Sequence, residues 1–125
     1  PVAGADTVVA LDGDRLIEAG GVSGLTVTVV RGIADEDCLS LRVADGRYVR
    51  HESFGLRLGW DDGGPLFLMD ATFCPRPGAE PRSVRLASFN YPGRFVRVRG
   101  GLLGLDPEVA GDTYAEETSF LITRR

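Results

Sequence analysis

Two polar side chains of complementary chemistry, His51 and Asp70, are candidates for binding a ligand. His51 is the only histidine in the sequence, and Asp70 follows it by 19 residues. A carboxylate accepts hydrogen bonds from two hydroxyl groups, while an imidazole can donate one hydrogen bond and accept another. Placed on neighbouring strands, these side chains would converge on a pocket suited to a sugar. Each also has a purely structural interpretation, as a histidine that supports the fold and an aspartate that caps or turns the chain.

Other groups of reactive residues give weak support for catalysis. The adjacent acids Asp61–Asp62 and Glu116–Glu117 are expected to be solvated, because glycoside hydrolysis needs two carboxylates on opposite sides of a sugar. The sequence has no Gly-x-Ser-x-Gly nucleophile motif. Trp60 is the only tryptophan, and we expect it in core or hairpin packing rather than as a stacking platform. The chain is therefore not predicted to be an enzyme, and no cofactor is expected.

The two cysteines, Cys38 and Cys74, lie 36 positions apart. Two thiols and one histidine at unrelated spacings make a poor four-ligand zinc site, so no metal is predicted. A disulfide is the better interpretation; it implies an oxidising compartment, and hence a secreted, extracellular protein. The chain begins at Pro1 without a signal-like apolar segment, so we interpret it as a mature or excised fragment.

Short stretches in which apolar residues alternate with others predict strands. These stretches are Leu25–Val29, Leu39–Val43, Phe54–Leu58 and Phe95–Arg99. Turn signals rich in glycine, proline and aspartate separate them. The only helices predicted are two short ones, around 33–38 and 106–110. This pattern indicates an all-β fold.

An internal repeat indicates the architecture. When the chain is shifted by 47 positions, Arg47–His51 aligns with Arg94–Val98, and the ungapped match covers about 27 residues. Asp70 then aligns with Glu117. A more divergent copy comes first, and its two matching segments imply that it has lost about 14 residues.

Three copies of this kind predict a β-trefoil, a barrel of six strands capped by three hairpins. We expect one domain over 1–125, with repeats at approximately 5–37, 38–84 and 85–125 and a shortened first repeat. An immunoglobulin-like sandwich is the alternative, but such a fold has no reason to repeat three times.

Several motifs together resemble one known family. They are Val29–Leu41, Tyr48–His51, Leu56–Leu58, Asp70–Pro75 and Ser88–Gly93. In combination they resemble the arabinose-binding domain of α-L-arabinofuranosidases, carbohydrate-binding module family 42, across about residues 23–122. The resemblance implies a β-trefoil without catalytic activity of its own. Such domains bind arabinofuranose side chains of arabinoxylan and arabinan in small pockets, one in each intact repeat.

The resemblance also assigns roles to individual positions. The pocket histidine of the family falls on His51, its pocket aspartate on Asp70, and its disulfide on Cys38 and Cys74. Further ligand-binding residues are predicted beside His51: Tyr48, Glu52 and Phe54.

The histidine and aspartate pair is retained only in the middle repeat. The aligned positions are Val98 and Glu117 in the third repeat and Ala19 and Gly24 in the first. Because valine offers no side-chain hydrogen bond and glutamate is one methylene longer than aspartate, we expect a single competent pocket.

Composition narrows the range of partners. The net charge is −4, and all 14 basic residues are arginines. Nucleic acid is not expected as a partner, because a phosphate-binding surface needs a net basic face. No apolar run approaches the roughly 20 residues that cross a bilayer, so no membrane partner is expected.

We therefore predict a carbohydrate-binding module for polysaccharides or oligosaccharides with arabinofuranosyl groups. We expect a monomer, with a tethered glycoside hydrolase domain as a candidate partner. The alternative is a degenerate trefoil with a structural or protein-interaction role, in which Arg50, His51 and Asp70 form a buried ion-paired network.

Overall fold

The computed structural model describes residues 5–12, 15–18, 25–79, 81, 83–99, 102–121 and 123–124. Within these ranges the chain forms twelve strands and two short helices, so the predicted all-β class is confirmed. The strands are β1 Ala5–Asp12, β2 Arg15–Glu18, β3 Leu25–Arg31, β4 Leu39–Arg42, β5 Tyr48–Glu52, β6 Gly55–Gly59, β7 Phe73–Pro77, β8 Ser83–Ser88, β9 Arg94–Arg99, β10 Leu102–Pro107, β11 Phe120–Leu121 and β12 Thr123–Arg124. The helices are α1 Pro65–Asp70 and α2 Asp112–Glu117.

Seven of the strands close into a barrel, one more than the six that we expected. Antiparallel pairing runs from β8 through β9, β10, β6, β5, β4 and β7 and returns to β8. The pairing of β7 with both β4 and β8 completes the ring. Closure removes the exposed edges along which open sheets associate with other chains.

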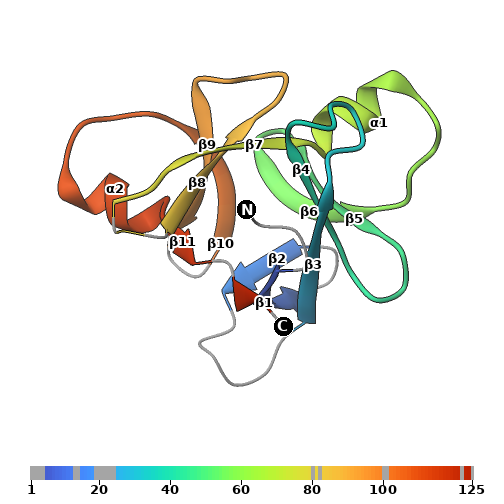
Figure 1. Ribbon diagram of the computed structural model, residues 1–125, viewed down its shortest axis with the longest axis horizontal. Coiled ribbons are helices and arrows are strands. Elements are labelled where there is room, and N and C mark those ends of the chain that lie inside the picture. Colours follow the sequence, from blue (N-terminus) through green and yellow to red (C-terminus); the bar gives the residue numbers. More distant parts are fainter. Residues whose placement is uncertain are drawn as a thin grey trace.

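The order of elements repeats along the chain. A hairpin of β5 and β6 is followed by α1, and a hairpin of β9 and β10 is followed by α2; the two helices lie 47 positions apart. In Figure 1 these two groups lie on the right and on the left, β7 crosses between them, and β1 to β3 lie below. The 47-residue shift found in the sequence therefore corresponds to a repeated local structure.

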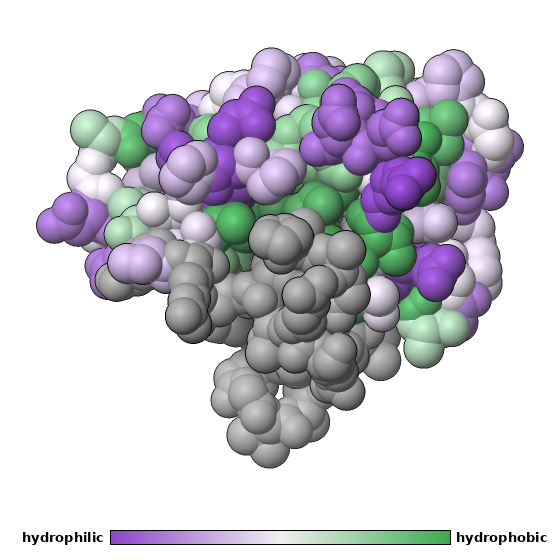
Figure 2. Space-filling model, in the orientation of Figure 1, coloured by the Kyte–Doolittle hydropathy of each residue, from purple (hydrophilic) through white to green (hydrophobic). Residues whose placement is uncertain are grey.

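The barrel interior is filled by the alternating apolar side chains of its strands. On β6, for example, Leu56 and Leu58 are buried whereas Arg57 is partly exposed. The main core cluster consists of Val27, Val29, Leu39, Leu41, Val43, Val49, Leu56, Leu58, Phe73, Leu86, Val96, Leu103 and Leu105. Figure 2 shows hydrophilic and hydrophobic residues mixed on this face of the molecule, with the hydrophobic ones most continuous toward the middle of the view.

The two helices that we predicted are absent from the structure. Residues 33–38 form a tight loop, in which Gly32 N donates to Cys38 O at 2.8 Å and Asp37 N donates to Asp35 Oδ1 at 2.9 Å. Such a local side-chain hydrogen bond gives the backbone an alternative to a helix. Asp106 lies in β10 instead, where it pairs with Phe95 of β9.

The observed helices lie elsewhere. The short apolar run 65–69 lies in α1, and its helical signal was the proline at the first helical position. Asp70 consequently ends a helix rather than lying on a strand. Neither described helix is long and apolar enough to cross a membrane.

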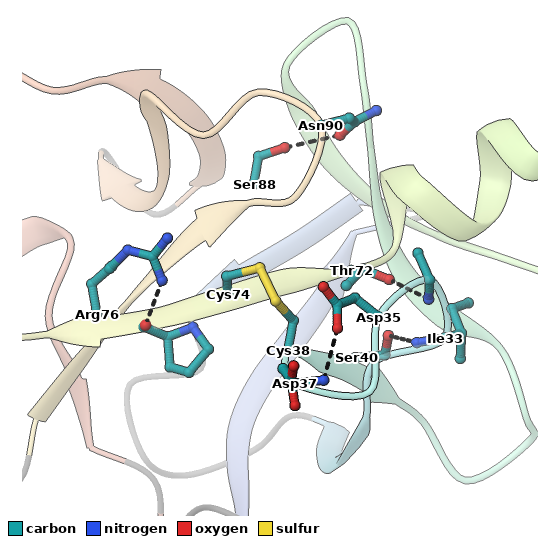
Figure 3. The surroundings of a disulfide bond; sticks show 12 residues. Ile33, Asp35, Asp37, Cys38, Ser40, Thr72, Cys74, Arg76, Ser88 and Asn90 are labelled. Carbon is teal, nitrogen blue, oxygen red and sulfur yellow. Dashed lines mark hydrogen bonds between the residues drawn. A yellow bond between two sulfur atoms is a disulfide. The ribbon is translucent and has the colours of Figure 1, made fainter.

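Cys38 and Cys74 form a disulfide that joins the 32–38 loop to β7 (Figure 3). Close by, Ala34 N donates to Thr72 Oγ1 at 3.0 Å, and Thr72 Oγ1 donates to Leu68 O at 2.8 Å. The covalent bond and these hydrogen bonds together hold the chain that follows Asp70.

Removal of the disulfide should destabilise the domain substantially. The bond joins residues 36 positions apart, and on the loop-entropy model a loop of this length contributes about 4 kcal/mol. We expect the double variant Cys38→Ala, Cys74→Ala to lose roughly that free energy of unfolding in urea titrations. Reductant should destabilise the wild type and leave the double variant unaffected. A loss below about 1 kcal/mol would contradict the expectation.

Alkaline pH should also weaken the fold through Tyr114. Burial raises the pKa of Tyr114 above its ordinary value of 10.0, and the Glu108 charge adds to the rise. Above pH 10.0 the unfolded chain releases this proton before the folded one does, so stability falls as pH rises. In urea titrations at about pH 9 and about pH 11, the Tyr114→Phe variant should show a smaller decrease than the wild type. The variant Tyr91→Phe, changed at an exposed tyrosine, is the control.

Candidate functional site

Asp70 lies at the centre of a polar network. Its Oδ2 accepts a hydrogen bond from Arg50 Nη2 at 2.6 Å, and its Oδ1 accepts one from Asn90 Nδ2 at 2.8 Å. The carboxylate is almost fully buried, with 6% of the side chain exposed. A carboxylate at the carboxyl end of a helix is destabilised by the negative end of the helix dipole. The positive charge of Arg50 offsets this repulsion and also the cost of burying the Asp70 charge.

His51 completes this network from β5. Its Nε2 lies 3.0 Å from Asn90 Oδ1 and 3.3 Å from Asp70 Oδ1. Because the Asn90 amide nitrogen donates to Asp70, the amide oxygen is the atom that faces the histidine. Nε2 thus faces two acceptors, a geometry that favours a proton on this nitrogen, and in the tautomer protonated at Nε2 the other ring nitrogen, Nδ1, is an acceptor.

The turn between β5 and β6 supplies an aromatic wall. Phe54 lies with its ring 6.3 Å from that of His51 at an interplanar angle of 24°, and the Tyr91 ring packs edge-on at 5.3 Å from Phe54. Ser53 and Phe54 have positive φ angles of 52° and 61°. The left-handed conformation costs a residue with a side chain about 1–2 kcal/mol. Strain of this kind is often found at functional sites.

These groups surround an open pocket of about 330 Å³. The residues that line it are Arg50, His51, Glu52, Ser53, Phe54, Leu66, Asp70 and Tyr91. Four of the five ligand-binding residues predicted from the sequence therefore lie together: His51, Asp70, Glu52 and Phe54. Tyr48 is not among the lining residues; its ring packs edge-on against Phe67, with 6.3 Å between centroids. No group of three metal-ligating side chains occurs among the described residues.

Five residues at the pocket were not assigned to it from the sequence: the lining residues Arg50, Ser53, Leu66 and Tyr91, and Asn90, which contacts His51 and Asp70. Asn90 and Tyr91 lie in a motif that carried the family resemblance, but no local pattern places them 39 and 40 residues away beside His51. Arg50 was considered only as part of a structural network. The recurrence of an arginine and an acid 20 residues apart in both repeats was the signal for this pair.

The third repeat contains the same ion pair without the histidine. Arg97 Nε donates to Glu117 Oε1 at 2.7 Å, and this bond raises the pKa of Arg97. Arg97 lies over the Tyr114 ring at 4.9 Å, just as Arg50 lies over Phe67 at 5.3 Å. The arginine–acid pair is thus a repeated structural element, and the imidazole and Asn90 distinguish the middle repeat.

The first-repeat positions named in the sequence analysis, Ala19 and Gly24, lie outside the described residues. The side chain of Val98, the aligned position in the third repeat, is likewise outside them.

A closed barrel with a small pocket of buried polar groups and aromatic walls is the arrangement of an all-β ligand-binding domain. Residues 19–122 match the family described as the alpha-L-arabinofuranosidase B (AbfB) domain, and the chain belongs to this family. The match covers only that domain, which is the accessory domain of the enzymes that contain it.

Relatives and solved structures agree with this assignment. The chain is 42% identical over 72 residues to an arabinofuranosidase/β-xylosidase of Trichoderma koningii, which covers 56% of this chain and 14% of the relative. It is 37% identical over 95 residues to alpha-L-arabinofuranosidase B of Aspergillus oryzae, and this match covers 74% of this chain and 19% of the relative. A crystal structure of an arabinofuranosidase complexed with arabinofuranosyl-α-1,2-xylobiose superposes with a TM-score of 0.81 and 25% identity over 98% of this chain and 31% of that one. The chain thus spans less than a third of each of these proteins.

Replacement of Ser53 by glycine should stabilise the domain. Glycine removes a left-handed cost of about 1–2 kcal/mol and adds back roughly 0.5–1 kcal/mol of unfolded-state entropy. The expected net gain is about 0.5–1 kcal/mol in the free energy of unfolding, measured by urea titration. The variant Ser53→Ala, which loses the hydroxyl but keeps Cβ, should show no such gain. An equal gain in both variants would mean that the hydroxyl, and not backbone strain, is responsible.

Proposed function

We propose that this domain is a non-catalytic module that binds terminal L-arabinofuranose side chains of arabinoxylan or arabinan. The observation that carries the proposal is the His51, Asp70 and Asn90 network beside the aromatic wall of Phe54 and Tyr91. Buried polar groups that are already oriented can bind hydroxyls without reorganising, while the aromatic rings cover the apolar face of a sugar. The names of the relatives support the choice of sugar, as does the arabinofuranosyl oligosaccharide bound to the solved arabinofuranosidase.

The chemistry of the pocket fits a small neutral ligand. Asp70 already accepts two hydrogen bonds, from Arg50 and Asn90, and a carboxylate has about four acceptor sites. It therefore retains capacity for one or two ligand hydroxyls, and His51 Nδ1 offers another acceptor. So small a set of contacts predicts weak binding, of order millimolar to tens of micromolar, or about 4–6 kcal/mol.

The carboxylates of the pocket are arranged for binding rather than for hydrolysis. Asp70 is ion-paired with Arg50, and Glu52 is ion-paired with Arg57. Hydrolysis by a carboxylate pair needs one acid that donates a proton and one base or nucleophile. Two arginine-paired carboxylates instead present fixed acceptors, which supports a role without catalysis.

We also infer that the fold is a β-trefoil with a shortened first repeat and repeats near 5–37, 38–84 and 85–125. The support is that the order of β5, β6 and α1 recurs in β9, β10 and α2. We further infer a secreted domain that acts beside a tethered glycoside hydrolase, since the disulfide fits an oxidising compartment and the relatives are several times longer than this chain.

A structural or protein-interaction role is the second candidate. The observation that favours it is the Arg97 and Glu117 pair, which recurs in the third repeat without the histidine. A glycan array separates the two candidates, because a structural domain would show no selectivity among saccharides.

Substitutions in the pocket should weaken binding of arabinofuranosyl-α-1,2-xylobiose, measured by isothermal titration calorimetry. His51→Val, which copies the aligned residue of the third repeat, should weaken binding about tenfold, because one or two hydrogen bonds are lost. Asp70→Asn should weaken it by at least as much, since a charged acceptor is replaced by a neutral one.

The matched control is Glu117→Gln, the same type of change at the aligned acid of the third repeat. It should leave affinity within about twofold of the wild type. A folded Asp70→Asn variant that binds as the wild type does would exclude Asp70 from the site. A wild-type domain that binds no arabinofuranoside would refute the proposed function.

A further inference from the structure

We propose that Arg94 is a positioning residue for this pocket, which it serves by holding the Phe54 ring in place. The inference rests on the proposed function. Arg94 Cζ lies 3.6 Å from the centroid of the Phe54 ring, the shortest of the four arginine–aromatic distances among the described residues. Arg94 is not among the residues that line the pocket, so it acts on a ligand only through its neighbours.

The guanidinium of Arg94 is itself fixed in place. Its Nη1 donates to Leu105 O at 3.0 Å, and its backbone N donates to Tyr91 O at 2.8 Å. Leu105 N in turn donates to Phe54 O at 2.8 Å. Arg94 therefore joins the two aromatic walls of the pocket, Phe54 and Tyr91, to one strand pair of the barrel.

Phe54 needs such a constraint because its backbone conformation is unfavourable. Its φ is 61°, and the preceding residue also lies in the left-handed region. The aligned positions in the sequence of the third repeat are Gly100 and Gly101, and glycine as a residue type can adopt such angles without a steric penalty. A bulky residue keeps this conformation only where the surrounding structure holds it in place. The arginine stacked on the Phe54 ring provides this constraint.

An arginine at this position of the repeat does not by itself stack on an aromatic ring. Arg47, the aligned residue one repeat earlier, pairs with Asp45 at 3.0 Å on an exposed turn. Arg94 instead packs against a turn from the preceding repeat. The segment 90–94, which runs from the end of β8 to the first residue of β9, therefore brings Asn90, Tyr91 and Arg94 up to the pocket of the middle repeat, and of these three only Tyr91 lines it.

The test compares Arg94→Met with Arg85→Met. Arg85 offers a matched control, because it lies over the Phe95 ring at 4.4 Å and donates to Pro77 O at 3.1 Å, but does not line the pocket. Arg94→Met should weaken binding of arabinofuranosyl-α-1,2-xylobiose by about fivefold, within the range expected for a partly buried cation–π contact. Arg85→Met should lose stability without loss of affinity, and an equal effect on affinity in both variants would overturn the proposal.

A double-mutant cycle then asks whether Arg94 acts through Phe54. In the background Phe54→Gly, which copies the third repeat, Arg94→Met should cause no further loss of affinity. A full additional fivefold loss would mean that Arg94 affects binding by another route.

A measurement without ligand separates this proposal from the proposed function. The Phe54 ring resonances should shift and broaden in NMR spectra of Arg94→Met, and remain unchanged in Arg85→Met. Unchanged Phe54 resonances in Arg94→Met would overturn the positioning role. This readout holds even if the wild-type protein binds no arabinofuranoside, which would refute the proposed function alone.

Discussion

The ion pair between Arg50 and Asp70 is the interaction on which the site depends. A carboxylate with 6% exposure at the end of a helix is stable only when its charge is paired and its oxygens are hydrogen-bonded. Arg50 and Asn90 meet both conditions, and His51 joins the same carboxylate. A single carboxylate thus ties β5, α1 and the chain after β8 together, so that a structural requirement also orients the polar groups of the pocket.

The barrel brings these three segments together because β7 pairs on one side with β4 and on the other with β8. Thr72, just before β7, accepts a hydrogen bond from Phe89 N, next to Asn90. The disulfide fixes β7 two residues after Thr72. The distance between Asp70 and Asn90 is therefore set by the covalent and hydrogen-bonded framework behind the pocket, and not by the pocket residues alone.

The internal repeat shows which features of the candidate site recur elsewhere in the molecule and which are found only there among the described residues. Arginine–acid pairing and the arginine over an aromatic ring occur in both later repeats. The imidazole, the asparagine and the strained Phe54 turn are found around the middle pocket. The candidate site thus differs from the repeated structural motif at a few positions, and Asn90 and Tyr91 reach it from the segment that follows β8.

The sequence alone determined the all-β class and the 47-residue repeat, because alternation and periodicity are local properties of a chain, and it singled out His51 and Asp70 as a candidate pair. It did not predict α1, whose short apolar run is equally compatible with a strand. Only the tertiary structure placed Asn90 against His51, Arg94 over Phe54 and Tyr48 away from the pocket. These contacts join residues about 40 positions apart, and they exist because barrel closure brings different repeats together. The local conformational propensities of the sequence do not predict such long-range contacts.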